Sequence, residues 1–170
     1  AVLIDPLNIA LLRAGRLEQA KQQLKKLLDM EPNYPHAWWV LGQTYISESR
    51  YEEGISRIEK ALDLSRNNAL ILSGLGWAYA ISSRESDAQK VIDELKGRMK
   101  KEYIRPYLFA KIYASLGEID QAFEWLDKAY DEHDVSLAFM LNDETLVMLH
   151  SDQRFNRLLK KINLIQLKGS

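Results

Sequence analysis

Residues 35–68 read PHAWWVLGQTYISESRYEEGISRIEKALDLSRNN and hold the fullest copy of a pattern that returns every 34 residues. Gly42 is followed at that interval by Gly76, and Tyr45 is followed by Tyr79. A fixed period of about 34 residues is typical of helix–turn–helix arrays, in which each repeat contributes two helices and packs against its neighbours. The sequence therefore predicts an all-α solenoid, an architecture that serves binding rather than catalysis.

The period divides the chain into four repeats and a tail that does not repeat. The repeats cover residues 1–34, 35–68, 69–102 and 103–136, and the tail covers residues 137–170. In the repeats we expect helices at residues 6–14, 17–30, 35–48, 51–64, 69–82, 85–99, 105–116 and 119–132. In the tail we expect short helices at residues 144–149 and 152–162, with Asp143 and either Ser151 or Asp152 as N-caps. Because the last repeat of an array needs a cover, the tail is interpreted as a capping segment.

Each later repeat carries small residues where its two helices should touch. The eighth and twentieth positions are Gly42 and Gly54 in the second repeat, and Ala110 and Ala122 in the fourth. Small side chains let two helices approach closely, while large apolar residues fill the space beside them. The fifteenth position is glycine or serine in every repeat, which indicates the turn between the helices. Pro106 should occupy the first position of its helix.

These positions resemble the pattern of the tetratricopeptide repeat (TPR) family. The second repeat carries that pattern most fully, at Trp38, Leu41, Gly42, Tyr45, Gly54, Ile58 and Ala61. The resemblance extends over residues 1–136 and implies an α-solenoid whose first helices line a concave surface for proteins or peptides. The first repeat departs from the pattern, since Asn8 stands where the family has a small residue.

Residues 100–164 resemble a narrower group, the C-terminal TPR arrays of bacterial multidomain regulators. The residues that carry this resemblance are Tyr113, Leu116-Gly117-Glu118, Ala122-Phe123, Trp125-Leu126, Ala129-Tyr130, Ser151-Asp152, Arg154-Phe155 and Leu158-Leu159. In those regulators the repeats follow a protein kinase, a nucleotide cyclase or a winged-helix DNA-binding domain. The resemblance implies a partner-sensing or assembly module that is part of a larger regulatory protein.

The amino-acid composition of the chain argues against nucleic acids and membranes as partners. A net charge of −1 gives no electrostatic reason to expect nucleic acid or an anionic membrane. The chain has no cysteine, so it has no disulfide framework and no thiolate metal site, which fits a reducing compartment. No apolar run approaches the roughly 18 residues of a membrane span. We therefore expect a cytoplasmic protein whose partners are proteins.

No sequence motif indicates catalysis or a cofactor. The run Asp131-Glu132-His133-Asp134 contains metal-ligating residue types. Consecutive side chains of a helix point in different directions, so we expect a solvated helix end and no metal site. Gly74-Leu75-Gly76 lacks the preceding strand and the third glycine of a phosphate-binding loop. We expect a chain that is not an enzyme and that needs no cofactor.

The concave surface is the candidate site. If the first helix of each repeat lines it, the lining is apolar and aromatic, and large aromatic side chains are common anchors at interfaces. The predicted groove residues are Trp39, Val40, Gln43, Ile46, Leu70, Trp77, Ile81, Tyr107, Leu108 and Lys111. We expect them to bind an amphipathic helix or an extended apolar peptide.

The sequence leaves alternatives to a ligand-binding groove open. The tail or a neighbouring subunit could cover these side chains, or the groove could face solvent without a ligand. A structural scaffold that self-associates through apolar surface is the alternative function. The acidic C-terminal tails of chaperones are not expected as ligands, because the positions of the family's carboxylate clamp hold Asp5, Ile9, Val40, Leu70 and Gly74.

The predicted small-residue contact can be tested in the fourth repeat. Ala122→Leu should overpack the contact between its helices and lower stability by about 1–3 kcal/mol. A thermal melt measures this loss, and an unchanged melting temperature would show that the register is wrong.

Overall fold

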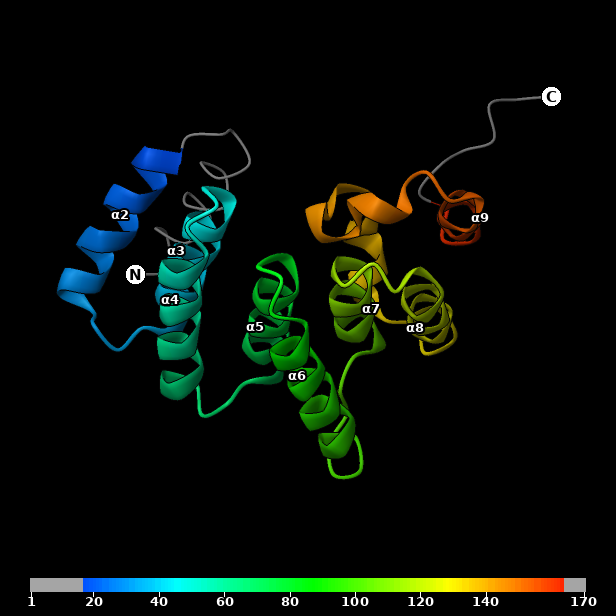
Figure 1. Cartoon of the computed structure of the whole chain (residues 1–170), viewed down its shortest axis with the longest axis horizontal. Helices are drawn as coiled ribbons and strands as arrows, with labels where there is room; N and C mark the ends of the chain where they lie inside the picture. The colour runs from blue at the N-terminus through cyan, green and yellow to red at the C-terminus, as the bar shows by residue number, and fades with distance from the viewer. Residues whose placement is uncertain (1–16, 164–170) are drawn as a thin grey trace. The chain divides into compact units, whose positions relative to one another are not determined.

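The computed structural model describes residues 17–163, and every regular element in that range is a helix (Figure 1). The α-helices are α2 (Leu17–Met30), α3 (Pro35–Ser47), α4 (Tyr51–Leu64), α5 (Ala69–Ile81), α6 (Glu85–Arg98), α7 (Pro106–Ser115), α8 (Ile119–Asp131) and α9 (Gln153–Lys161). Two 3₁₀-helices, η1 (Val135–Asn142) and η2 (Glu144–Leu149), lie between α8 and α9. The all-α prediction is confirmed in this range, and the expected helix at residues 6–14 lies outside it.

The chain forms two compact units, which are described separately. Unit 1 comprises residues 1–78 and contains α2, α3, α4 and most of α5. Unit 2 comprises residues 79–170 and contains the end of α5 and the elements from α6 to α9.

The contact between α3 and α4 depends on two facing glycines. A methyl group added to Gly42 would lie 2.6 Å from the Cγ1 of Ile58 and 2.8 Å from the carbonyl oxygen of Gly54. A methyl group added to Gly54 would lie 2.8 Å from the carbonyl oxygen of Gly42 and 2.6 Å from the Ile46 side chain. The backbones of the two helices therefore touch with no room for a Cβ atom, as the small-residue pattern predicts.

Left-handed residues close the turns between paired helices. Ser49, Ser83 and Gly117 have φ angles of 61°, 62° and 76°. After each of them, a backbone N–H donates to the carbonyl of the repeated tyrosine, over 3.0 Å at Tyr45, 2.8 Å at Tyr79 and 3.0 Å at Tyr113. This bond between residues five apart is the main bond of a Schellman helix ending. The predicted turn at the fifteenth position of the repeat is confirmed at these three sites.

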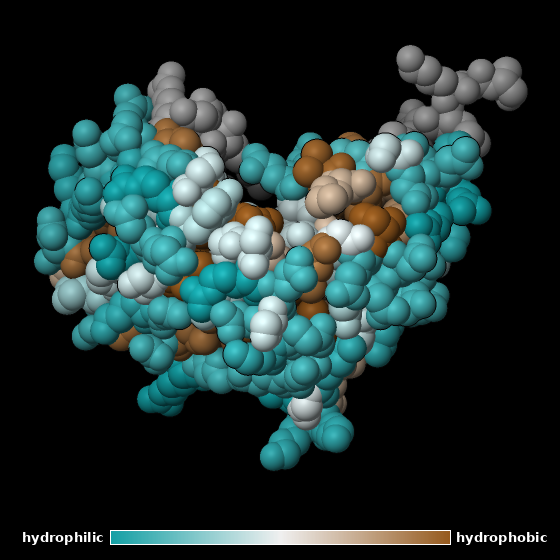
Figure 2. Space-filling model, in the orientation of Figure 1, coloured by the Kyte–Doolittle hydropathy of each residue, from teal (hydrophilic) through white to brown (hydrophobic). Residues whose placement is uncertain are grey.

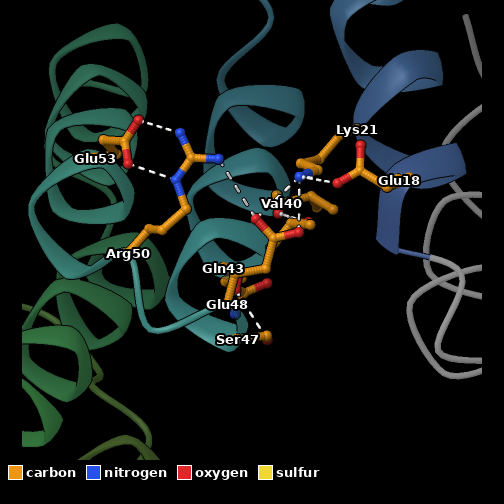
Figure 3. Close-up of polar contacts among 9 residues, drawn as sticks. Glu18, Lys21, Val40, Gln43, Ser47, Glu48, Arg50 and Glu53 are labelled. Carbon is orange, nitrogen blue, oxygen red and sulfur yellow. Dashed lines mark hydrogen bonds and ion pairs between the residues drawn. The ribbon is translucent and has the colours of Figure 1, made fainter.

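Unit 1 has an apolar core between α2 and α3. Buried leucines of α2 pack against α3, with Trp38 and Trp39 at the edge, and the buried members are Leu24, Leu27, Leu28, Ala37, Val40, Leu41 and Tyr45. Beside this core, the buried Lys21 ammonium lies 2.7 Å from a carboxylate oxygen of Glu48 and 2.5 Å from one of Glu18 (Figure 3). The hydrogen bonds from Lys21 to Glu18 and Glu48 raise the pKa of Lys21, and the bond to Glu48 ties α2 to the end of α3.

Unit 2 is built around the α7–α8 pair. Phe109 stacks on Trp125 with ring centroids 4.1 Å apart, and Ala110 and Ala122 are fully buried. The helix α9 lies along α8, since Arg154 pairs with Asp120 at 2.8 Å and Lys161 lies 5.2 Å from the ring centroid of Tyr130.

Several predicted helix starts are confirmed in unit 2. Pro106 opens α7. Asp143 caps η2 by accepting from the N–H of Thr145, and Asp152 caps α9 by accepting from the N–H of Arg154. The 3₁₀-helix η1, which Asp134 caps, was not predicted from the sequence. Within residues 17–163, no helix combines the length and the apolar character of a membrane span.

Gly54→Ala should destabilise the chain by about 1–3 kcal/mol, because the added methyl group meets the backbone carbonyl oxygen of Gly42, which side-chain motion cannot move. Gly97→Ala is the matched control, since nothing lies within 4 Å of its added methyl group in α6. That control should stabilise by about 0.5–1 kcal/mol through helix propensity. Urea unfolding of both variants measures the difference, and equal effects would contradict the close α3–α4 contact.

Candidate partner-binding site

In unit 1 the structure brings four of the predicted groove residues together, across one contact between α3 and α5. Trp39 of α3 lies against Gly74 of α5, because a methyl group on Gly74 would be only 2.7 Å from the indole nitrogen of Trp39. Residues three or four positions apart share a helix face. Gln43 therefore lies beside Trp39, and Leu70 and Trp77 lie on either side of Gly74. We call these five residues, Trp39, Gln43, Leu70, Gly74 and Trp77, the α3–α5 face.

The α3–α5 face is apolar and half-buried. All five residues have intermediate exposure, and none carries a charge. The Trp39 ring meets the imidazole of His36 edge-on, with centroids 5.1 Å apart. The buried indole N–H of Trp39 has no hydrogen-bond acceptor among the described residues. Trp39 is thus held by packing, and Gly74 provides the space for it.

Two predicted groove residues of unit 1 belong to its packing. Val40 is buried in the core between α2 and α3. Ile46 is also buried, and its side chain fills the space over Gly54 on α4. The 34-residue period assigns both residues to the concave side, but neighbouring helices cover them.

In unit 2 the tail covers the predicted groove residues of α7. Tyr107 is only 3% exposed, and its hydroxyl donates to Asp143 over 2.9 Å. Leu108 is buried as well, and the Lys111 ammonium lies 3.5 Å from the same Asp143 oxygen. Ile81, at the end of α5, is half-buried in this unit. On α7 the structure therefore matches the alternative in which the tail occupies these positions.

Asp143 fastens the tail to α7. Besides the contacts to Tyr107 and Lys111, its other oxygen accepts from the N–H of Thr145 over 3.0 Å and from the Thr145 hydroxyl over 2.6 Å. Burial acts to raise the pKa of Asp143, but the Lys111 charge and the hydrogen bonds from Thr145 and Tyr107 outweigh it. The net pKa is lowered. Burial and the nearby Asp143 charge raise the pKa of Tyr107, so its hydroxyl remains a donor.

The acidic run at the end of α8 has a structural role at Asp134. That carboxylate is buried and accepts from the backbone N–H groups of Ser136 and Tyr107, over 2.9 and 3.3 Å. The neighbouring His133 is exposed and has a φ angle of 56°. Within residues 17–163, no group of three or more His, Asp or Glu side chains lies together where it could hold a metal ion.

Two family models, both described as Tetratricopeptide repeat, match residues 9–69 and 107–132, together about half of the chain. The chain belongs to the tetratricopeptide repeat family.

A relative with 23% identity over 129 residues is Anaphase-promoting complex subunit 3 of Schizosaccharomyces pombe. The match covers 73% of this chain and 19% of that protein, so this TPR chain spans about a fifth of the relative's length.

Two crystal structures of MamA are similar to the chain in fold. The first has a TM-score of 0.53 and 20% identity, and the match covers 95% of this chain and 87% of that one. The second has a TM-score of 0.54 and 20% identity, with coverages of 92% and 95%. At this identity the likeness concerns the fold alone, and it confirms the predicted α-solenoid.

Asp143→Asn should lower the stability of unit 2 by about 1–3 kcal/mol at neutral pH, because hydrogen bonds to a buried charge are lost. The pKa of Asp143 is lower in the folded chain than in the unfolded chain. Its contribution to the free energy of unfolding is therefore fully present above the pKa of an unperturbed Asp carboxyl, about 3.9. It is lost as the pH falls through the folded value. The difference between wild type and variant should therefore shrink in acid.

Chemical unfolding between neutral pH and acid measures this trend. Asp127→Asn, an exposed change on α8, is the control and should alter stability little at any pH. A difference for Asp143→Asn that does not depend on pH would contradict the role assigned to its charge.

Proposed function

We propose that the chain is a non-enzymatic protein–protein interaction module, in which the α3–α5 face binds an apolar or amphipathic peptide. Tetratricopeptide repeats in general mediate interactions between proteins, which supports the general role. The observation that supports the finer proposal is the pair of half-buried tryptophans, Trp39 and Trp77, on an uncharged face across one helix–helix contact.

The chemistry of the face suits an apolar ligand. Tryptophan offers a large contact area at a small cost in side-chain entropy, and it is enriched among the residues that contribute most to binding. The Gln43 side-chain amide can both donate to and accept from a peptide backbone at the edge of the face. An amphipathic helix or an extended segment with bulky apolar residues fits these features.

The lack of free cations at the predicted groove positions disfavours acidic peptides as ligands. Val40, Leu70 and Gly74 provide no cation, so nothing at these positions would hold the carboxylates of an acidic peptide tail. On α7 the only cation among the predicted groove residues, Lys111, is already paired with Asp143. We therefore place the ligand on unit 1 and expect its contact residues to be apolar.

We also propose a wider context for the chain, as part of a larger regulatory protein. The likeness of residues 100–164 to bacterial regulators supports a place beside an effector domain in a larger regulatory protein. The name of the Schizosaccharomyces pombe relative describes it as one subunit of a complex, which supports a role in assembly. The lack of cysteine supports a reducing compartment, such as the cytoplasm. Self-association is the second candidate function, favoured by a separate apolar surface on η1 and η2.

Trp77→Ala should weaken binding of a partner peptide by about tenfold or more, as expected for an aromatic anchor at the centre of an interface. A displayed library of random peptides, selected on the immobilised chain, supplies the ligand, and titration calorimetry measures its affinity. Trp38→Ala is the control. It changes a neighbouring tryptophan whose indole donates to the Pro32 carbonyl, away from the α3–α5 face.

Gly74→Ala adds a second test that removes no side chain. The added methyl group displaces the Trp39 indole, so affinity should fall while the circular dichroism spectrum stays helical. Equal losses of affinity for Trp38→Ala and Trp77→Ala, or peptide binding unchanged by Trp77→Ala and Gly74→Ala, would refute the α3–α5 face as the binding site.

A further inference from the structure

The exposed hydrophobic side chains of the chain are concentrated on η1 and η2. Among the described residues seven large hydrophobic side chains are exposed, and all but Met30 and Tyr103 belong to this segment. We call the five the tail patch: Val135, Phe139, Leu141, Val147 and Met148, which are 41–73% exposed. Figure 2 shows brown and tan atoms gathered over this part of unit 2, which is orange in Figure 1.

The tail patch exists because η1 and η2 carry apolar side chains on their exposed faces as well as on their buried faces. Side chains three residues apart line up in a 3₁₀-helix. One such row is buried in each helix, Leu137 with Met140 and Leu146 with Leu149. A second row of η1 runs through Val135 and Leu141 and is exposed. A cap that only covered its own repeat would carry polar residues on that row, so the apolar residues indicate a contact with another surface.

Two charges of opposite sign flank the tail patch. Arg105 is exposed, and its guanidinium donates to the Ser136 hydroxyl beside Val135 over 3.3 Å. Glu144 is exposed at the start of η2, three residues before Val147. Neither side chain forms an ion pair within residues 17–163. The surface therefore carries an apolar centre together with one free positive and one free negative group.

The size of the tail patch suits a contact between two folded proteins. Five large apolar side chains that are 41–73% exposed form a patch on the order of 300–600 Å², the size at which apolar patches of single chains are often functional. A stable interface buries about 800 Å² on each partner, and its polar rim makes up the remainder. The patch and its charged rim together approach that size.

We propose that the tail patch is the contact surface of a homodimer in which a second copy of this chain presents the same patch across a two-fold axis. In such a dimer, a contact of residue i in one copy with residue j in the other is repeated as a contact of j with i, so a patch that carries both charge signs can be complementary to itself. Arg105 of each copy then faces Glu144 of the other, around the apolar centre. This surface lies in unit 2 and is independent of the α3–α5 face, so each proposal can fail without the other.

Sedimentation velocity over a concentration series from about 1 μM to 500 μM tests the dimer. The wild-type chain should pass from monomer to dimer, and Phe139→Ser should weaken association by about tenfold or more. Met30→Ser is the matched control, because Met30 is 67% exposed, close to the 65% of Phe139, and lies in unit 1. It should leave association unchanged, and a thermal melt of both variants checks that they fold.

A charge reversal tests the pairing itself. Arg105→Glu and Glu144→Arg should each weaken the dimer by about two- to fivefold, and the double variant should restore it. A wild-type chain that stays monomeric throughout the series would overturn the proposal, whether its own termini or a different protein covers the patch. A dimer that survives Phe139→Ser, or that the double variant does not restore, would overturn it as well.

Discussion

The close approach of α3 and α4 at Gly42 and Gly54 is the constraint on which unit 1 depends. Because neither glycine has room for a Cβ atom, the two backbones fix the spacing and the angle of the pair. That geometry lets Ile46 and Ile58 fill the space beside the glycines and leaves the opposite side of α3 for α2. Trp39 lies on the same helix as Gly42, so the α3–α4 contact also helps to position Trp39 against Gly74 of α5.

The two units differ in the contacts that hold the first helix of a repeat, α3 in unit 1 and α7 in unit 2. In unit 1, α3 is fixed by apolar packing, and the α3–α5 face is uncharged. In unit 2, α7 is covered by the tail, which is held by buried leucines and by the carboxylates of Asp134 and Asp143. One repeat pattern thus yields one helix whose aromatic side chains remain half-exposed and another whose equivalent positions are occupied by the chain itself.

The sequence predicts the helices well because the period transfers information between repeats: Ser49, Ser83 and Gly117 end their helices at one position. It predicts the candidate site only in part, because a period assigns residues to a side of a helix but not to what covers that side. Val40 and Ile46 are buried by neighbouring helices, and Tyr107 is buried by Asp143, which lies 36 residues further along the chain. The helix η1 was missed because it lies outside the repeated pattern and depends on local capping by Asp134.

The turns of this chain leave room for evolutionary change. Ser49 and Ser83 adopt the left-handed conformation that Gly117 adopts at the same repeat position. A residue other than glycine in that region carries strain of about 1 kcal/mol or more. Replacing these serines by glycine would relieve that strain at some cost in unfolded-chain entropy, and any net gain would offset destabilising changes on the α3–α5 face or the tail patch. A lineage of such chains could thus diversify its binding surfaces while its turns keep the helices in register.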